Sequence, residues 1–179
     1  MLQHTSSALK RMRAKYLAKS EPAQRVIQQM MMDIQENDRI LEIGTGNGKM
    51  FKKIIGQLEK GSLKSIESSK RKLRKTARAN RSAIKAGTGE ILPGRPESIP
   101  FNDRSFHKVL SLHTVETVSD YQLALKEVYR VLQIDGRLYI VLQPSGISEK
   151  DVIQLLRDQY FREISVVSRD SFHFITAIK

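Results

Sequence analysis

The stretch Arg39–Met50, RILEIGTGNGKM, decides the fold that the rest of the chain extends. A short apolar run that carries one acid, Glu42, leads directly into glycines at every second position, Gly44, Gly46 and Gly48. An amphipathic pattern with a helical period follows the last glycine. Glycines let a ligand approach the main chain closely, and a helix start offers free N–H groups. The stretch therefore predicts a strand, a glycine turn that carries a ligand, and a helix.

Alternating strand and helix patterns continue from this stretch to the end of the chain. Strands are expected at 39–43, 62–67, 90–92, 106–112 and 137–142, with helices at about 48–59, 69–87, 121–132 and 148–160. Two alternating segments, 161–167 and 172–178, predict a closing antiparallel hairpin. The pattern predicts an α/β fold: a Rossmann-like, doubly wound, mostly parallel seven-stranded sheet with helices on both faces. Such sheets bind ligands at the carboxyl ends of their strands.

Composition limits the class of protein. The chain has 179 residues, of which 40% are hydrophobic and 28% charged, and it contains no Cys, which excludes disulfides and thiolate catalysis. It holds no apolar run of membrane-spanning length, and its first residues lack the apolar core of a signal peptide, so we expect a cytoplasmic protein. We expect a single domain over 1–179, with helices in 1–35 and the ligand-binding core in 36–179.

The net charge of +12 is concentrated in two segments. Residues 1–20 hold five bases and no acid, and residues 68–86 hold eight bases and no acid. Without these thirteen, 18 bases face 19 acids, so the body of the chain is near neutral. The plainer interpretation is that the basic segments form solvent-exposed helix faces. The alternative is that the basic segments 10–19 and 70–85 bind a nucleic acid or an anionic membrane surface, although no aromatic residue interleaves with the bases of 70–85.

The glycine spacing narrows the choice of ligand. A dinucleotide-binding G-x-G-x-x-G would need a third glycine at position 49, which is Lys49, and the chain contains no P-loop. Glu67 ends the next expected strand about twenty residues downstream, where a carboxylate can accept hydrogen bonds from a ribose diol or simply be solvated. Glu42 either contacts an amino group of the ligand or holds the turn.

Four segments, in order, resemble the class I S-adenosylmethionine-dependent methyltransferases. EIGTGNG at 42–48 resembles the family's first motif, and Glu67 stands where the family places its ribose-binding acid. The segment 94–109, GRPESIPFNDRSFHKV, resembles the family's loop into strand four, and 125–136, LKEVYRVLQIDG, resembles its L-x-E-x-x-R-V-L motif. The resemblance covers roughly residues 25–143 and is closest to the small-molecule group allied to the ubiquinone/menaquinone C-methyltransferases.

The resemblance implies S-adenosyl-L-methionine as the cofactor. The residues that it assigns to cofactor binding follow the carboxyl ends of the strands: Glu42, Gly44, Thr45, Gly46, Gly48, Glu67, Ser68, Pro96, Glu97 and Leu112. Two departures concern the adenine. The family's loop Asp is Arg95 here, and the next residue, Pro96, has no N–H to donate to the ring. Glu97 is the candidate substitute for that Asp.

Methyl transfer from a sulfonium is a displacement on an already activated carbon, so the protein mainly supplies alignment and exclusion of water. The expected wall of the reaction site is SLHTVET at 111–117, after the fourth strand. The resemblance places His113 next to the transferred methyl group, where it either packs against the cofactor or takes part in catalysis. Glu116 is the candidate base. We interpret His107 as structural and predict no metal site, since the four histidines are scattered.

Three functions are open from the sequence. The main hypothesis is a methyltransferase with a small-molecule acceptor. The two basic segments support an alternative, a methyltransferase of RNA or of a membrane lipid. Arg95 and Pro96 support a third, a binding module that has kept the cofactor fold without catalysis.

Overall fold

The computed structural model describes residues 30–31, 33–112, 118–142, 147–169 and 172–179. The chain divides into two compact units, Met1–Asp33 and Ile34–Lys179. Met30, Met31 and Asp33 are helical, and nearly all of the helices expected in 1–35 fall outside the described residues. None of the helices in the described ranges is long and apolar enough to cross a membrane.

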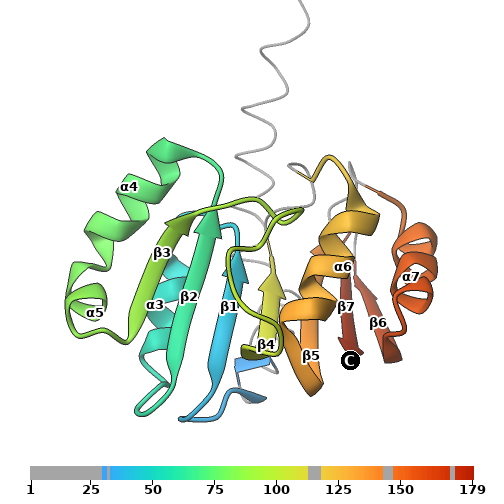
Figure 1. Ribbon diagram of the computed structural model, residues 1–179, viewed down its shortest axis with the longest axis horizontal. Helices are drawn as coiled ribbons and strands as arrows, with labels where there is room; N and C mark the ends of the chain where they lie inside the picture. Colours follow the sequence, from blue (N-terminus) through green and yellow to red (C-terminus); the bar gives the residue numbers. More distant parts are fainter. Residues whose placement is uncertain (1–29, 32, 113–117, 143–146, 170–171) are drawn as a thin grey trace, which may run out of the picture. The chain divides into compact units, whose positions relative to one another are not determined.

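A seven-stranded sheet organises the second unit (Figure 1). Its strands, in the order β3-β2-β1-β4-β5-β7-β6, are β1 (Arg39–Ile43), β2 (Ser62–Glu67), β3 (Gly89–Pro93), β4 (Phe106–Ser111), β5 (Leu132–Leu142), β6 (Arg162–Arg169) and β7 (Phe172–Ile178). Strands β1 to β5 pair in parallel, and β7 pairs antiparallel with both β5 and β6. The sheet confirms the predicted Rossmann-like fold and its closing hairpin, and it places the last strand between β5 and β6.

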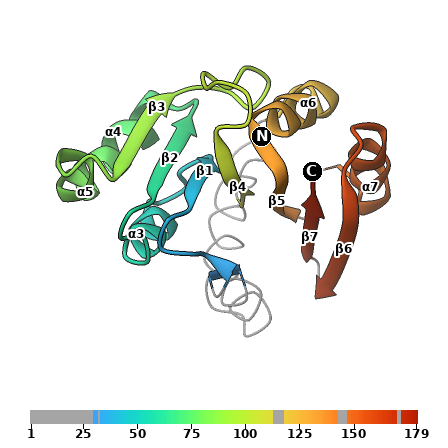
Figure 2. The ribbon, with the colours of Figure 1, turned by 60° about the horizontal axis from the view of Figure 1, so that its bottom comes forward.

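Helices cover both faces of the sheet. They are α3 (Lys49–Ile55), α4 (Lys70–Ala79), α5 (Arg81–Lys85), α6 (Tyr121–Val131) and α7 (Glu149–Asp158). Figure 2 shows α3 and α6 on opposite faces, as right-handed crossovers require when the chain moves first toward β3 and later toward β5. Buried apolar side chains of α6 and α7 pack against the sheet and form the core on their face.

Two helix boundaries differ from the prediction. α3 ends at Ile55 instead of near residue 59. Gly61, expected to end that helix, lies instead against Asp38, where a Cβ would come within 2.2 Å of the backbone oxygen. The helix expected over 69–87 is interrupted at Asn80, which is buried and separates α4 from α5.

The loop between β3 and β4 is held against α6 by two charged residues of that helix. Arg130 donates to the backbone oxygens of Ile99 and Phe101 at 3.0 and 2.8 Å, and Glu127 accepts from the Ile99 N–H at 2.9 Å. The two side chains also pair with each other, with 2.7 Å between Nε of Arg130 and Oε1 of Glu127. This arrangement explains the E-x-x-R spacing in the 125–136 segment, because residues three apart share one helix face.

Candidate functional site

The predicted binding residues meet at the carboxyl edge of the parallel strands. β1 and β2 pair with Ile43 opposite Ile66, so the glycine turn and Glu67 leave the sheet side by side. Pro93, at the end of β3, pairs with Glu67. β4 lies on the other side of β1 and is followed by Leu112, which is buried. The turn therefore stands where the strand order reverses, which is the usual ligand position in such sheets.

The glycine turn has a left-handed backbone at each of its glycines. The φ angles of Gly44, Gly46 and Gly48 are 80°, 52° and 77°, a region that L side chains rarely adopt. At Gly48 a side chain also lacks space, since a Cβ would lie 2.9 Å from Cγ2 of Thr76 and 3.3 Å from Nδ2 of Asn80. The turn and α4 therefore fit closely against each other. Asn80 is buried at this contact, and its Nδ2 donates to the backbone oxygen of Thr76 at 3.0 Å.

Glu67 joins the turn to the start of α4. Its Oε2 accepts from the N–H and the hydroxyl of Thr45 at 3.1 and 3.0 Å, and its Oε1 accepts from the Ser69 N–H at 2.9 Å. The hydroxyl of Thr76 reaches that of Thr45 at 3.3 Å. Glu67 ends β2, as predicted, and its side chain is buried, which contradicts the alternative of a solvated acid. A carboxylate has about four acceptor positions, so these three bonds leave capacity for a further donor.

Glu42 is a buried carboxyl group with one unpartnered oxygen. Its Oε2 accepts from the Ser65 hydroxyl at 2.7 Å, whereas Oε1 has no hydrogen-bond partner within the described part of the chain. Burial raises the pKa of Glu42 to about 7, and the charge of Glu67 adds to the increase while the Ser65 bond opposes it. Unpartnered buried oxygens are uncommon in proteins. This one directly precedes the glycine turn and fits an N–H or O–H donor of a ligand.

The loop after β3 uses its polar side chains internally. Pro96 is buried. Glu97 accepts from both the N–H and the hydroxyl of Ser119 at 2.7 Å, and Arg95 lies 3.0 Å from that hydroxyl and 3.4 Å from Glu97. Burial acts to raise the pKa of Glu97, but the hydrogen bonds from Ser119 and Arg95 outweigh it and lower the pKa to about 2. Arg95 and Glu97 thus hold the loop to the start of α6.

The remaining predicted residues have different outcomes. His113 and Glu116 lie outside the described residues, so their catalytic assignment stays a prediction. Ser68 follows Glu67 and is exposed. His107 lies at the start of β4, far along the strand from the turn, and its Nδ1 accepts from the Arg39 N–H at 2.8 Å. Burial, followed by the charge of Arg39, lowers the pKa of His107. Its bond to the Arg39 N–H ties the start of β4 to the start of β1, and its structural interpretation stays a prediction.

Sequence reasoning missed Ser65 and Thr76, which support the two site carboxylates, and it named Thr45 as a binding residue without its hydrogen bonds to Glu67. Ser65 and Thr45 donate to them from the neighbouring strand and turn, and Thr76 extends the network into α4. One signal was available: Thr76 and Asn80 are polar residues four positions apart on the thin apolar stripe of the expected helix, so they share its buried side.

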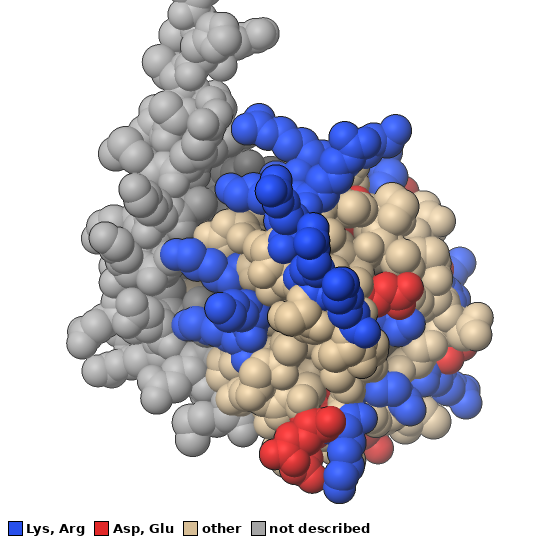
Figure 3. All heavy atoms as spheres, turned by 90° about the vertical axis from the view of Figure 1, so that its left-hand side faces the viewer, with Lys and Arg blue, Asp and Glu red and all other residues tan. Residues whose placement is uncertain are grey.

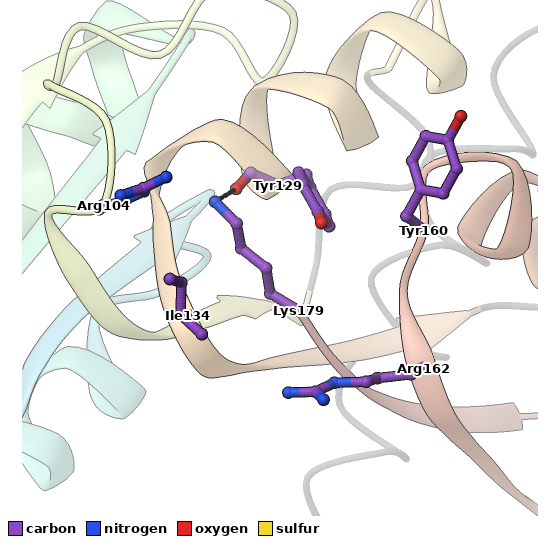
Figure 4. Close-up of a pocket in the computed structure, with 6 residues that line it drawn as sticks. All are labelled: Arg104, Tyr129, Ile134, Tyr160, Arg162 and Lys179. Atoms are coloured by element: carbon purple, nitrogen blue, oxygen red, sulfur yellow. Dashed lines mark hydrogen bonds between the residues drawn. The ribbon is translucent and has the colours of Figure 1, made fainter.

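A separate hollow of about 480 Å³ lies at the other edge of the sheet. Figure 4 shows the residues that line it: Arg104, Tyr129, Ile134, Tyr160, Arg162 and Lys179. Lys179 donates to the backbone oxygens of Tyr129 and Leu132, which closes one side of the hollow. The hollow contains none of the predicted site residues.

The order of the strands, the glycine turn and the acid at the end of β2 define a class I S-adenosylmethionine-dependent methyltransferase. Residues 41–140 match the family model described as a methyltransferase domain, and the chain belongs to that family. It is 57% identical over 159 residues to YrhH of Bacillus subtilis (strain 168), a protein named as a methyltransferase, with 87% of each chain covered.

A second relative is the ubiquinone/menaquinone biosynthesis C-methyltransferase UbiE of Francisella tularensis subsp. novicida (strain U112). The two chains are 30% identical over 130 residues, which is 71% of this chain and 49% of UbiE. The chain therefore spans about half the length of UbiE.

Solved structures agree with the fold. A SAM dependent methyltransferase from Aquifex aeolicus superposes with a TM-score of 0.73 at 20% identity, covering 87% of this chain and 88% of that one. The [4+2]-cyclase SpnF superposes with a TM-score of 0.75 at 15% identity, covering 88% of this chain and 80% of its own. At these identities the likeness shows the fold alone, and a cyclase among such structures shows that the fold also carries other reactions.

Proposed function

We propose that the protein transfers the methyl group of S-adenosyl-L-methionine to a small-molecule acceptor. The observation that carries the acceptor class is the 30% identity to UbiE, a C-methyltransferase of ubiquinone/menaquinone biosynthesis. Within the described part of Ile34–Lys179, the strands are joined by single helices, helix pairs and loops, with no added domain. We place the activity in the cytoplasm as part of the same proposal, which cell fractionation tests.

The residues at the carboxyl edge fit the proposed cofactor. Bound S-adenosyl-L-methionine supplies a methyl group on a sulfonium, which reacts without a metal or a second cofactor. Glu67 keeps acceptor capacity for one further donor, such as a ribose hydroxyl, and Oε1 of Glu42, which has no partner among the described residues, is suited to the amino group. The left-handed turn at Gly44–Gly48 lets the cofactor lie against the main chain.

The adenine contact is proposed to differ from the family pattern. Pro96 has no N–H to offer, and the carboxylate of Glu97 already accepts two hydrogen bonds from Ser119. Apolar packing around the buried Pro96 is therefore proposed as the main contact to the ring, with Glu97 in support. His113 and Glu116 are proposed to form the acceptor side of the site, where the protein excludes water and, for an acceptor that carries a proton, provides a base.

Calorimetry with S-adenosylhomocysteine tests the cofactor site. We expect Glu67→Gln to weaken binding by about 10- to 150-fold, because hydrogen bonds to a charged group contribute about 1.5–3 kcal/mol each. Glu163→Gln, the same change at an exposed residue of β6, is the matched control and should bind as the wild type does. Equal affinity for both variants would remove Glu67 from the site.

Transfer of a labelled methyl group tests the acceptor. The wild type is incubated with labelled S-adenosyl-L-methionine in three separate reactions. One contains quinol-type small molecules, one total RNA and one lipid extract. Label in the small-molecule fraction supports the proposal. Label only in RNA or lipid contradicts the small-molecule assignment, and binding of the cofactor without transfer in any fraction points to a binding module.

A further inference from the structure

The outer side of α4 and α5 carries a dense set of unpaired bases. All eight Lys and Arg residues of 70–85 are exposed, and none has an ion-pair partner in the part of the chain that the structure describes. We call them the basic surface: Lys70, Arg71, Lys72, Arg74, Lys75, Arg78, Arg81 and Lys85. Figure 3 shows Lys and Arg side chains projecting along this side of the molecule, with few acids among them.

Helical spacing arranges these bases in rows. Lys70, Arg74 and Arg78 follow one another four residues apart on α4, which is a rise of about 6 Å per step, and Arg71 with Lys75 forms a neighbouring row. Like charges at this spacing repel and destabilise the helix that carries them. The rows therefore oppose folding, and a partner of opposite charge would relieve that repulsion.

The chemistry of the basic surface argues against two kinds of contact, insertion into lipid and stacking on single-stranded bases. Interfacial helices bind lipid through an apolar face. Here the large exposed hydrophobic residues of the described chain, Leu123, Ile134, Tyr160 and Val167, all lie outside α4 and α5. The surface also lacks aromatic residues on which single-stranded bases could stack. The contact that the basic surface is suited to make is with regularly spaced phosphates.

Arginine supplies four of the eight charges, and its planar guanidinium binds phosphate through two parallel hydrogen bonds. A double helix presents phosphates in regular series along two strands, which suits bases held in straight rows. We propose that the basic surface binds the phosphate backbone of a double-helical nucleic acid without reading its sequence. The proposal goes beyond the methyl-transfer function and does not depend on it.

The binding of a fluorescently labelled duplex, followed by anisotropy, tests the proposal. A 20-base-pair RNA and a DNA of the same sequence are titrated with the full chain at 50 to 200 mM salt. If about five phosphates are contacted, affinity falls by roughly 500-fold over this range, because log K decreases by about 0.9 per contact for each unit of log salt. Affinity that does not change with salt would overturn the proposal.

A matched pair of triple variants locates the contact. Arg71→Gln, Arg74→Gln and Arg78→Gln together remove three charges from the basic surface, and we expect duplex affinity to fall on the order of 100-fold near physiological salt. The control removes three exposed charges from α6 and α7: Lys126→Gln, Lys150→Gln and Arg157→Gln. The control should bind nearly as tightly as the wild type. Equal weakening by both triple variants would show that only net charge matters and would overturn the proposal.

Two further measurements distinguish the remaining outcomes. Binding to phosphatidylglycerol vesicles but not to either duplex would assign the basic surface to a membrane and overturn the proposal. S-adenosylhomocysteine binding, measured on every variant, should be unchanged, so failure of the cofactor site is separable from failure of the basic surface. If the α4 variant does not fold, Arg81→Gln with Lys85→Gln on α5 should still weaken duplex binding by tens of fold, and unchanged affinity would reject the proposal.

Discussion

Replacing Gly48 with alanine measures how closely the glycine turn fits against α4. An L-residue in the left-handed conformation that Gly48 adopts is destabilised by about 1–2 kcal/mol. The added Cβ would also lie 2.9 Å from Cγ2 of Thr76 and 3.3 Å from Nδ2 of Asn80, and both neighbours are buried. Overpacking of this kind contributes about 1–3 kcal/mol. We expect Gly48→Ala to lower the free energy of unfolding by about 2–5 kcal/mol.

Gly87 offers a matched control for the part of this stability loss that comes from the left-handed backbone alone. Its φ is also +77°, but nothing lies within 4 Å of where its Cβ would be. Gly87→Ala should therefore lower the free energy of unfolding by only about 1–2 kcal/mol. The difference between the two variants, measured by urea unfolding, isolates the contact between the turn and α4.

A double variant identifies the atom responsible. Thr76→Ser removes the Cγ2 that the new Cβ would meet while it keeps the hydroxyl, so the pair Gly48→Ala and Thr76→Ser should show a favourable coupling of about 1–2 kcal/mol. Equal losses for the two glycine variants, together with strict additivity in the double variant, would refute the close fit of Gly48 against α4.

Three other predictions follow from the site and its supports. Between pH 4.5 and about 7, the folded state keeps the proton on Glu42 whereas the unfolded state has released it, because the folded-state pKa is raised. The free energy of unfolding should therefore fall by about 3 kcal/mol as the pH rises through this window. Urea unfolding measures this decrease, and Glu42→Gln should abolish it. Arg130→Met leaves the backbone oxygens of Ile99 and Phe101 without their donor, so we expect a loss of about 1–3 kcal/mol and faster hydrogen exchange in the loop before β4; unchanged exchange would contradict the clamp. Thr45→Val removes a hydroxyl donor to the carboxylate that ends β2 and should weaken S-adenosylhomocysteine binding about fivefold in calorimetry without unfolding the chain.

Most strands were predictable because they are coded locally, but β5 begins at Leu132, five residues before its predicted start at 137. β1 and β2 have the predicted bounds, 39–43 and 62–67, since short apolar runs between turn residues have few other interpretations. The position of β7 between β5 and β6 was not predictable, because pairing order depends on contacts between distant segments. The break at Asn80 was not predicted either: Asn80 lies beside Gly48, which is 32 positions earlier in the chain, and helical spacing does not encode such a contact.

The position of the candidate binding residues at the carboxyl edge of the sheet was predictable, whereas their hydrogen bonds were not. Glu67 follows from the strand and glycine pattern, but its three protein donors depend on side-chain directions that spacing does not encode. Glu97 shows the difference most clearly. The sequence presents it as a free carboxylate near the adenine, whereas the structure gives its oxygens to Ser119 and Arg95.

The fit of Gly48 against Thr76 and Asn80 also limits how the chain can vary. A side chain at position 48 would meet Cγ2 of Thr76 in α4, so position 48 can gain a side chain at low cost only if position 76 becomes smaller. The outward positions of the same helix touch nothing in the turn and are open to drift in charge. The inner side of α4 is thus restricted by the glycine turn. Its outer side can change to bind a new partner without affecting the turn.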